Sequence, residues 1–278
     1  MRELLRGVYD LHVHTSPDVG PRKCSDLELA ARMREAGMAG GAIKNHFLDT
    51  AGRAGLLREL YPELDIVGGI VLNRSVGGIN PFAAEQCALA GGKMLWFPTV
   101  DSLSYRRFHK KKDPEADFSG LLTVLDENGR LKPQVLEVLD VAARYRMVVG
   151  TGHLSATEGM PLIREGLRRG CRMVLTHCDN PADFYATEQQ VEAVRLGAYV
   201  EHSYLTTLWN RTPIETVAAM IRATGCEQVF LTTDFGQPAS PFSDEGMLRC
   251  ITDLSAQGFT PAELERMTII NPATLIAD

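Results

Sequence analysis

The sequence predicts an α/β fold of the (β/α)8 or TIM-barrel type, and its length, hydrophobic content and repeating element pattern support this prediction. The chain has 278 residues, of which 45% are hydrophobic, and this fits one large domain over residues 1–278 better than two small ones. Short apolar or β-branched runs alternate with longer stretches of helical periodicity. Eight such runs over this length match the usual size of a barrel, about 250 residues. A doubly wound open sheet remains the alternative, because periodicity alone does not show closure.

The first strand and the first helix carry the clearest signals at their ends. An apolar run over residues 7–14 predicts the strand, and residues 26–36 follow with helical periodicity. Ser25 is a suitable N-cap for this helix, and Gly37 is suited to end it. The other strands are expected at residues 41–46, 66–72, 94–99, 147–153, 173–178, 198–203 and 229–234.

Residues 101–133 interrupt the alternation and form an expected insertion after the fourth strand. The segment contains a lysine run, Lys110 to Lys112, and an Asn128-Gly129 pair between two short apolar runs. This pair is typical of a tight turn, so we expect a β-hairpin here. In a barrel the loop after a strand lies over the catalytic face, where this insertion would act as a lid or rim.

Charge, cysteine and hydropathy patterns restrict the class of partner and the compartment. A formal net charge of −6 without a basic stripe argues against nucleic acid, so we expect a small-molecule substrate. The six cysteines are scattered without a CxxC pair, which predicts reduced thiols in a cytoplasm. The first residues lack a signal-peptide profile, and no apolar run approaches the roughly 20 residues of a membrane span. Assembly into a homo-oligomer is left open.

Ionisable residues fall at the predicted carboxyl ends of several strands. His12 and His14 are two apart on the first strand, so their imidazoles point to one face. His153, His177 and Asp234 lie at the ends of the predicted fifth, sixth and eighth strands. Each of these three alone is typical of a hydrogen-bonded structural group. In a closed barrel, however, the strand ends meet on the face where active sites of this fold lie, so together they predict a metal site.

The chemistry of this set suits one or two divalent ions. Imidazole nitrogens and a carboxylate are typical ligands of Zn²⁺, which is the first expectation, with Mn²⁺, Fe²⁺ and Ni²⁺ as alternatives. A catalytic site keeps a position open for water, whose pKa then falls from about 15.7 towards 7. Asp234 would move the proton to the leaving group, while His177 binds the ion or polarises the substrate carbonyl.

Three further polar residues are expected to contact the substrate. Lys44 and His46 share a face of the second predicted strand, where a buried lysine needs a partner or a function. We expect Lys44 to bind a substrate anion, with a structural ion pair or a carboxylated lysine that bridges metals as alternatives. Glu201 shares its face with Ser203 near the end of the seventh strand and is expected at the mouth, whereas His202 faces the helices.

In their order along the chain, these residues resemble the amidohydrolase superfamily of metal-dependent hydrolases. The resemblance covers most of the chain and includes the segment Asn271-Pro272-Ala273 near its end. It implies that His12, His14 and Asp234 hold the more buried metal, joined by His153 in one-metal forms.

The resemblance implies a different arrangement for two-metal forms, in which His153 and His177 hold the second ion. Those forms usually have a carboxylated lysine or a glutamate bridge on the fourth strand. Residues 94–99 read Met-Leu-Trp-Phe-Pro-Thr, and Lys93 precedes them. This departure favours one metal or an unusual bridge.

The first strand is also similar to the opening of the PHP family of metal-dependent phosphoesterases. The shared features are Asp10-Leu11-His12-Val13-His14 and a following strand that ends in His46. The eighth strand ends Thr232-Thr233-Asp234-Phe235, without the Asp-x-His that closes the PHP site. A PHP-like phosphoesterase is therefore an alternative.

The function predicted from these residues is that of a metal-dependent hydrolase. A metal-activated water would attack an amide, ester, lactone or cyclic imide carbon of a small molecule. A metal-dependent decarboxylase is a second alternative, because the superfamily it resembles includes decarboxylases with the same ligand set. A barrel that binds a ligand without catalysis is the third.

Overall fold

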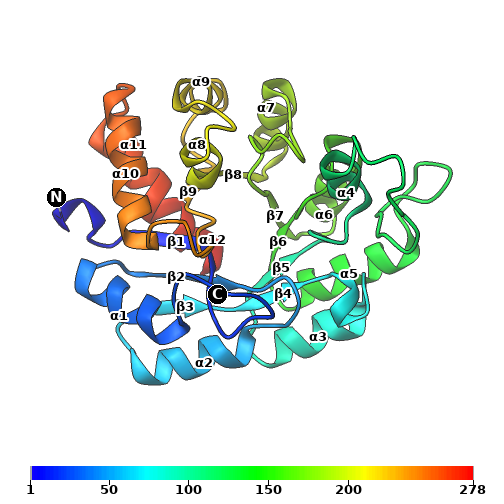
Figure 1. The fold of residues 1–278 in the computed structure, drawn as a ribbon, viewed down its shortest axis with the longest axis horizontal. Helices are drawn as coiled ribbons and strands as arrows, with labels where there is room; N and C mark the ends of the chain where they lie inside the picture. Colours follow the sequence, from blue (N-terminus) through cyan, green and yellow to red (C-terminus); the bar gives the residue numbers. More distant parts are fainter. Residues whose placement is uncertain (1, 278) are drawn as a thin grey trace.

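Parallel strands form a ring inside a layer of helices in the computed structural model, which describes residues 2–277 (Figure 1). Each strand pairs in parallel with the next one along the chain, except between β3 and β4. The strands are β1 (Tyr9–His14), β2 (Gly40–Lys44), β3 (Asp65–Val67), β4 (Gly69–Val71), β5 (Met94–Trp96), β6 (Val148–Gly150), β7 (Arg172–Leu175), β8 (Tyr199–Ser203) and β9 (Val229–Thr232). This confirms the predicted fold class.

β3 and β4 are two halves of the strand expected at residues 66–72, interrupted at Gly68. A Cβ atom on Gly68 would lie 2.3 Å from the carbonyl oxygen of Thr50, so the chain approaches its neighbour too closely for a side chain. The nine labelled strands therefore correspond to the eight predicted from the alternation.

The segment that follows β9 returns to β1. The His14 amide donates to the carbonyl of Phe235 at 2.7 Å, and the Asp234 amide donates to the carbonyl of His12 at 2.9 Å. These backbone bonds place the carboxyl end of β9 beside that of β1.

Apolar side chains fill the interior of the ring, and the C-terminal helix α12 (Asn271–Ile276) covers one end of it. Leu275 and Ile276 of α12 join the inner cluster, whose strand members are Leu11, Ala42, Val67, Val71, Met94, Trp96, Val148, Val174 and Phe230. The Asn271 side-chain amide donates to the carbonyls of Cys226 at 2.8 Å and Val229 at 2.6 Å. The Asn-Pro-Ala segment therefore fastens this helix to the start of β9.

Helices connect the strands and cover the outside of the ring. The outer core between strands and helices is apolar, as the sequence pattern predicts. The helices are α1 (Asp26–Ala36), α2 (Ala51–Leu60), α3 (Pro81–Leu89), α4 (Leu103–His109), α5 (Pro133–Arg144), α6 (Ala156–Arg168), α7 (Thr187–Leu196), α8 (Tyr204–Leu208), α9 (Ile214–Thr224), α10 (Ser243–Ala256) and α11 (Pro261–Glu265), with the 3-10 turns η1 (Arg2–Leu5) and η2 (Arg74–Val76) and the π-helical turn η3 (Arg266–Ile270).

α1 begins and ends where its capping residues predict. The Ser25 hydroxyl accepts from the Glu28 amide at 3.2 Å, and Gly37 has φ 74°, the left-handed conformation that ends many helices.

Most strands end earlier than the sequence predicts. Residues just after the strands leave the extended conformation, with φ 63° at Gly152, 27° at His177 and 55° at Asp234. The candidate site residues His153, His177 and Asp234 therefore lie on turns beyond the strands rather than on the strands themselves.

The expected hairpin in residues 101–133 is present in short form, with an antiparallel bridge between Leu125 and Leu131. The Asp126 amide donates to the Arg130 carbonyl at 2.8 Å, and the Lys132 amide donates to the Val124 carbonyl at 3.0 Å. Gly129 has φ 73° in this turn, as an Asn-Gly pair predicts.

Leu122, which the sequence places in the first strand of the hairpin, pairs with the start of the insertion instead. Its amide donates to the carbonyl of Asp101 at 2.8 Å, and its carbonyl accepts from the Leu103 amide at 2.9 Å. The hairpin is therefore shorter than predicted and spans residues 124–132, because Leu122 pairs with Asp101 and Leu103 instead.

The six cysteines are free thiols, in agreement with the absence of paired spacing. None of the helices in residues 2–277 combines the length and apolar character that a bilayer-spanning segment needs.

Candidate functional site

Five imidazoles form a closed ring at the carboxyl ends of the strands. Two of them lie on β1, one is the second residue after β2, and the other two lie on the turns after β6 and β7. Neighbouring ring centroids are 5.5 Å (His12–His14), 4.6 Å (His14–His46), 5.7 Å (His46–His153), 4.9 Å (His153–His177) and 5.7 Å (His177–His12) apart. The structure thus brings together every histidine that the sequence singled out for this site.

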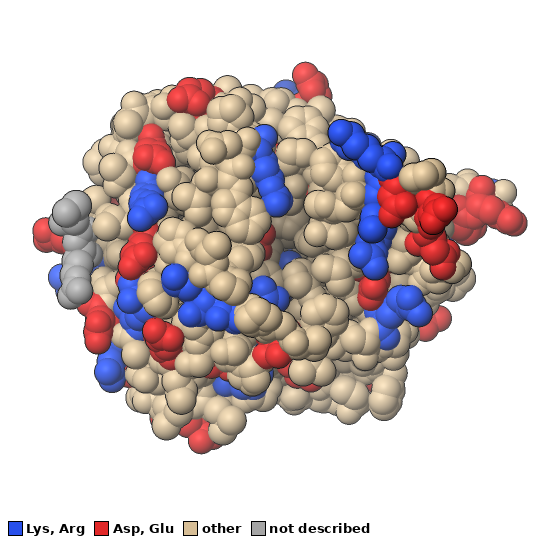
Figure 2. All heavy atoms as spheres, in the orientation of Figure 1, with Lys and Arg blue, Asp and Glu red and all other residues tan. Residues whose placement is uncertain are grey.

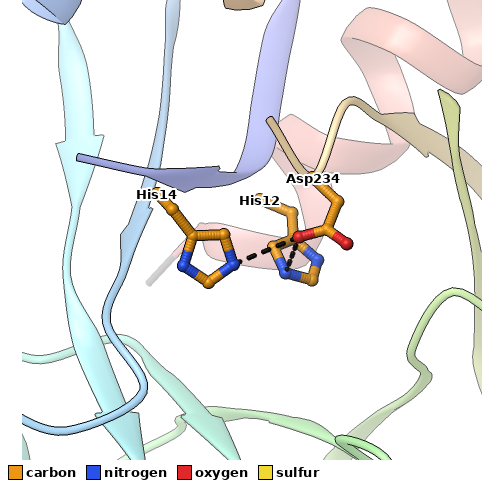
Figure 3. A group of neighbouring side chains, drawn as sticks. All are labelled: His12, His14 and Asp234. Carbon is orange, nitrogen blue, oxygen red and sulfur yellow. Dashed lines mark hydrogen bonds and ion pairs between the residues drawn. The ribbon is translucent and has the colours of Figure 1, made fainter. Parts of the chain in front are cut away.

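Asp234 meets two of these imidazoles (Figure 3). Its Oδ1 atom lies 3.0 Å from Nε2 of His12 and 3.1 Å from Nε2 of His14. Burial raises the pKa of the Asp234 carboxyl, but the imidazoles of His12 and His14 outweigh this and hold the pKa well below its usual range. One atom from each of the three residues lies within 4.8 Å of the others, a spacing that suits a shared ion.

Asp10 holds the segment that carries Asp234. Its carboxylate accepts from the Thr233 amide at 3.0 Å, from the Thr233 hydroxyl at 2.5 Å and from the Ser243 hydroxyl at 2.6 Å. Because Asp234 has φ 55°, a conformation that residues with a Cβ adopt rarely, its position depends on such external bonds.

Glu201 lies behind His12 rather than at the mouth. Its Oε1 atom is 2.5 Å from Nδ1 of His12 and also accepts from the Thr232 hydroxyl at 2.8 Å. The side chain is buried against His12, so the expected position of Glu201 at the mouth was wrong. A carboxylate at Nδ1 fixes the tautomer and leaves Nε2 facing Asp234.

Lys44 is fully buried at the floor of the ring. Its Nζ atom lies 2.9 Å from Nε2 of His12 and 5.0 Å from the centre of the Trp96 ring. Burial lowers the pKa of Lys44, against the opposing effect of the Asp234 and Glu201 carboxylates. Within residues 2–277 no carboxylate lies at ion-pair distance from Nζ, which argues against a simple structural ion pair.

Asp183 holds His177 from outside the ring. Its Oδ2 atom lies 2.8 Å from Nδ1 of His177, and both side chains are buried. Burial disfavours the imidazolium, but the Asp183 carboxylate outweighs it and raises the pKa of His177 to about 9.

His46 is held by residues of the neighbouring strands. Its Nδ1 atom lies 2.8 Å from the Thr99 hydroxyl, and Thr99 in turn accepts from the Asn73 side-chain amide at 2.7 Å. Thr99, in the segment after β5, therefore positions an imidazole in the region where the fourth predicted strand lacks a metal-bridging lysine or glutamate.

Several ring nitrogens have no partner in the described part of the chain. His14 Nδ1, His153 Nδ1 and His177 Nε2 are buried without a hydrogen bond to residues 2–277. Buried polar atoms normally have partners, so these nitrogens indicate a missing ligand. The imidazoles and the Asp234 carboxylate make up a nitrogen and oxygen donor set that fits a divalent metal ion such as zinc, and His14 turns its Nε2 atom towards Asp234.

A second group of buried polar residues, Cys178, Asp179 and His202, lies outside the ring. His202 Nδ1 is 3.1 Å from Asp179 Oδ1, while the Cys178 sulfur is 3.8 Å from both nitrogens of His202. The sulfur is equally far from both nitrogens and is therefore not directed at the lone pair of either one. This group therefore packs behind the site and is not arranged to bind an ion, and His202 faces the helices as predicted.

The residues that sequence reasoning missed are mostly those that hold the imidazoles. Asp10 stands in the same motif as His12 and was visible as a polar residue in a buried strand. Asn73 and Asp183 follow strands in loops without a recognisable spacing, and only the fold brings them to His46 and His177.

Comparisons with solved structures show the same fold. The chain is similar to an amidohydrolase from Pseudomonas aeruginosa (11% identity, 99% of this chain and 97% of that chain, TM-score 0.61). It is also similar to a phosphotriesterase homology protein from Escherichia coli (16% identity, 98% and 99%, TM-score 0.63). A third similar structure is 2,6-dihydroxybenzoate decarboxylase from Rhizobium (12% identity, 98% and 98%, TM-score 0.61). The resemblance to the PHP family gains no support here.

Comparison at the level of sequence gives a family rather than an activity. No curated protein matches the chain. One family model matches residues 7–201, well over half of the chain and the region that holds every ring histidine. The chain therefore belongs to the family of unknown function DUF6282.

Proposed function

We propose that the protein is a metal-dependent hydrolase of the amidohydrolase type, which cleaves an amide, ester, lactone or cyclic imide bond of a small molecule. The observation that carries the proposal is the placement of Asp234 Oδ1 3.0 and 3.1 Å from Nε2 of His12 and His14, at the strand ends. This arrangement supports a metal centre where active sites of barrels lie. The similar folds of an amidohydrolase and a phosphotriesterase homology protein favour the same class.

The proposed ligands are His12, His14, Asp234 and His153. His177 would complete a second site with His153 if two ions bind. Zinc is proposed first, because the donors are imidazole nitrogens and a carboxylate. When bound, a divalent ion supplies the Lewis acidity that activates water and polarises a carbonyl.

The protein's own residues supply proton transfer and orientation. The Asp234 carboxylate is anionic and buried beside the ion site, so it is placed to take a proton from water and return it to the leaving group. His177 is oriented by Asp183, which leaves Nε2 free to donate to the developing oxyanion. Lys44 and His46 form the floor and one wall, where they would contact the substrate.

A decarboxylase is the second candidate, and two observations favour it. The fold matches that of 2,6-dihydroxybenzoate decarboxylase over 98% of both chains, and buried Lys44 supplies a positive charge that would pair with a carboxylate. Release of carbon dioxide from aromatic carboxylates, without hydrolysis of lactones or imides, would favour this candidate over the first.

The test combines metal content with turnover of a panel of amides, esters, lactones and cyclic imides. The purified protein should carry at least one equivalent of divalent metal and hydrolyse a member of the panel. His14→Ala should lose metal and turnover while retaining its circular dichroism spectrum. His109→Ala is the matched control for metal content, because its exposed imidazole lies outside the ring. Retention of metal and turnover in His14→Ala would exclude the proposed centre.

A further inference from the structure

Among the five imidazoles of the site, that of His46 differs in the partner of its Nδ1 atom. Carboxylates face the Nδ1 atoms of His12 and His177. The Nδ1 atom of His46 instead lies 2.8 Å from the Thr99 hydroxyl. An ionised carboxylate only accepts, so it holds a proton on Nδ1 and leaves the Nε2 lone pair of a neutral imidazole for an ion. A hydroxyl can donate or accept, so the other bonds of Thr99 decide which nitrogen of His46 carries the proton.

The orientation of the Asn73 side-chain amide is fixed by backbone groups. Its Oδ1 atom accepts from the Thr99 amide at 2.9 Å, and its Nδ2 atom donates to the carbonyl of His46 at 2.9 Å. A backbone amide only donates and a carbonyl only accepts, so the two ends of the Asn73 amide cannot be exchanged. The Nδ2 atom therefore also donates to the oxygen of the Thr99 hydroxyl, 2.7 Å away.

The Thr99 hydroxyl must then donate its own hydrogen to His46. Its oxygen already accepts from Asn73, and Thr99 is fully buried, so no solvent reaches the hydrogen. Within residues 2–277, Nδ1 of His46 is the one acceptor at hydrogen-bond distance from this hydroxyl. If Nδ1 carried a proton, the hydroxyl hydrogen would be buried without an acceptor, which is strongly unfavourable. The Nδ1 atom therefore lacks a proton, and the Nε2 atom carries one.

The Nε2 atom of His46 is accessible to a bound molecule. It has no hydrogen-bond partner in the part of the chain that the structure describes and, unlike the unpartnered nitrogens of His14, His153 and His177, it is not fully buried. The molecule is hollowed near the centre of the face in Figure 2, over the ring of strands that Figure 1 shows from the same side. A small molecule in the site can therefore reach this N–H group.

On the basis of the proposed function, we propose that His46 is a hydrogen-bond donor to the substrate and not a ligand of the metal ion. Its ring lies 4.6 Å from that of His14 and 5.7 Å from that of His153, so the donor stands beside two of the proposed ligands. The group that it binds is an acceptor, such as a carbonyl or carboxylate oxygen of a substrate held at the ion. A donor at this place also stabilises the negative charge that develops on a carbonyl oxygen during hydrolysis. Asn73 and Thr99 are positioning residues, which act through His46.

The first test reads the tautomer of His46 in protein labelled with 15N. Two-bond 1H–15N correlation spectra distinguish a protonated from an unprotonated ring nitrogen, and His46→Gln identifies the His46 signals by their loss. The inference predicts a proton on Nε2 at neutral pH, in metal-free and in zinc-loaded protein. An Nε2 atom without a proton in either form would overturn it.

The second test titrates zinc-loaded protein with acetate, a carboxylate small enough for a narrow site. The Nε2 proton signal of His46 should move downfield as acetate accepts the hydrogen bond, and methylammonium, which has no acceptor, should leave the signal in place. His46→Leu should weaken acetate binding about 10-fold or more, which corresponds to about 1.4 kcal/mol for a hydrogen bond to a charged group. A signal that acetate does not move would overturn the inference.

Zinc content separates a donor from a ligand. His46→Leu and His46→Gln should keep the zinc content of the unaltered protein, whereas His14→Ala should lose zinc. His46→Gln should also bind acetate within about threefold of the unaltered protein, because its carboxamide retains an N–H donor. Loss of zinc in both His46 variants would make His46 a ligand and overturn the inference.

Thr99→Val and Thr99→Ser test the positioning network without altering His46. Thr99→Val removes the hydroxyl, so it should shift the Nδ1 signal of His46 and weaken acetate binding by about 3- to 10-fold. Thr99→Ser retains the hydroxyl and should restore both. An unchanged Nδ1 signal in Thr99→Val would overturn the assigned tautomer.

None of these measurements requires turnover, so the inference and the hydrolase proposal can fail separately. A protonated Nε2 atom that responds to acetate supports the inference even if no ester or amide is hydrolysed. An unprotonated Nε2 atom in a protein that hydrolyses a member of the panel overturns the inference and leaves the hydrolase proposal standing.

Discussion

Single side chains behind the five histidines decide which nitrogen of a histidine faces the centre of the site. Glu201 and Asp183 each face the Nδ1 atom of a histidine, at 2.5 Å from His12 and 2.8 Å from His177. Such a carboxylate orients the imidazole of its histidine and raises the basicity of that imidazole, as partners of metal-bound histidines do. The residues that hold the histidines are therefore as much a part of the site as the histidines.

Asp10→Ala tests whether Asp10 holds the segment that carries Asp234 in place. Loss of the hydrogen bonds to Thr233 and Ser243 should destabilise the fold by about 3 kcal/mol, because the Thr233 amide is left buried without an acceptor. Urea denaturation measures the change. Asp140→Ala, which removes a half-exposed carboxylate from α5, should change stability by less than about 1 kcal/mol. A similar loss in both variants would show that Asp10 has no special role.

The pair His177 and Asp183 predicts a pH dependence in metal-free protein. The folded-state pKa of His177, about 9, lies above its ordinary value of 6.5. The stabilisation is therefore fully present below pH 6.5 and is lost as the pH rises through about 9. Histidine side-chain NMR should show His177 titrating above 6.5, and Asp183→Asn should move its pKa downwards. An unchanged titration in Asp183→Asn would contradict the assigned cause.

At the level of secondary structure, the sequence located every strand but not where each one ends. Apolar runs mark the strands because both faces are buried, and this property is local. The ends depend on contacts with other segments, as at Gly68, where the approach of Thr50 interrupts a run that reads as one strand. The hairpin in the insertion is shorter than predicted for the same reason, since Leu122 pairs with Asp101 and Leu103.

Gly68→Ala tests this account of the strand break. A Cβ atom 2.3 Å from the Thr50 carbonyl oxygen should cost about 2 kcal/mol or more in the free energy of unfolding. Gly52→Ala in α2 is the control, because a Cβ there meets no atom within 4 Å, and it should be neutral or stabilising by up to about 1 kcal/mol. Equal melting temperatures for the two variants would contradict the account.

In the whole molecule, the site is created where the last strand returns to the first strand. His14 and Asp234 are 220 residues apart in sequence, yet they are in contact because the segment after β9 returns to β1. The sequence predicted this meeting, since strand-end positions follow from the alternation. It did not predict the roles of Asn73 and Asp183, which reach His46 and His177 from loops whose paths depend on tertiary contacts.

Asn271→Ala tests how far the site depends on the opposite end of the barrel. Loss of the bonds to the Cys226 and Val229 carbonyls should destabilise the fold by about 2 kcal/mol, while metal content at saturating ion stays the same. Thr274→Ala, on the exposed side of α12, is the control and should have little effect. If the unfolding curves of Asn271→Ala match those of the unaltered protein, the hydrogen bonds of Asn271 do not stabilise the fold.

The central claim is that His12, His14 and Asp234 share one metal ion. Anomalous X-ray scattering recorded on both sides of the zinc absorption edge, from crystals grown with added zinc, tests it most directly. The account predicts a peak within about 2.0–2.2 Å of Nε2 of both histidines and of a carboxylate oxygen of Asp234. A fully occupied ion elsewhere with none between these three side chains would contradict it.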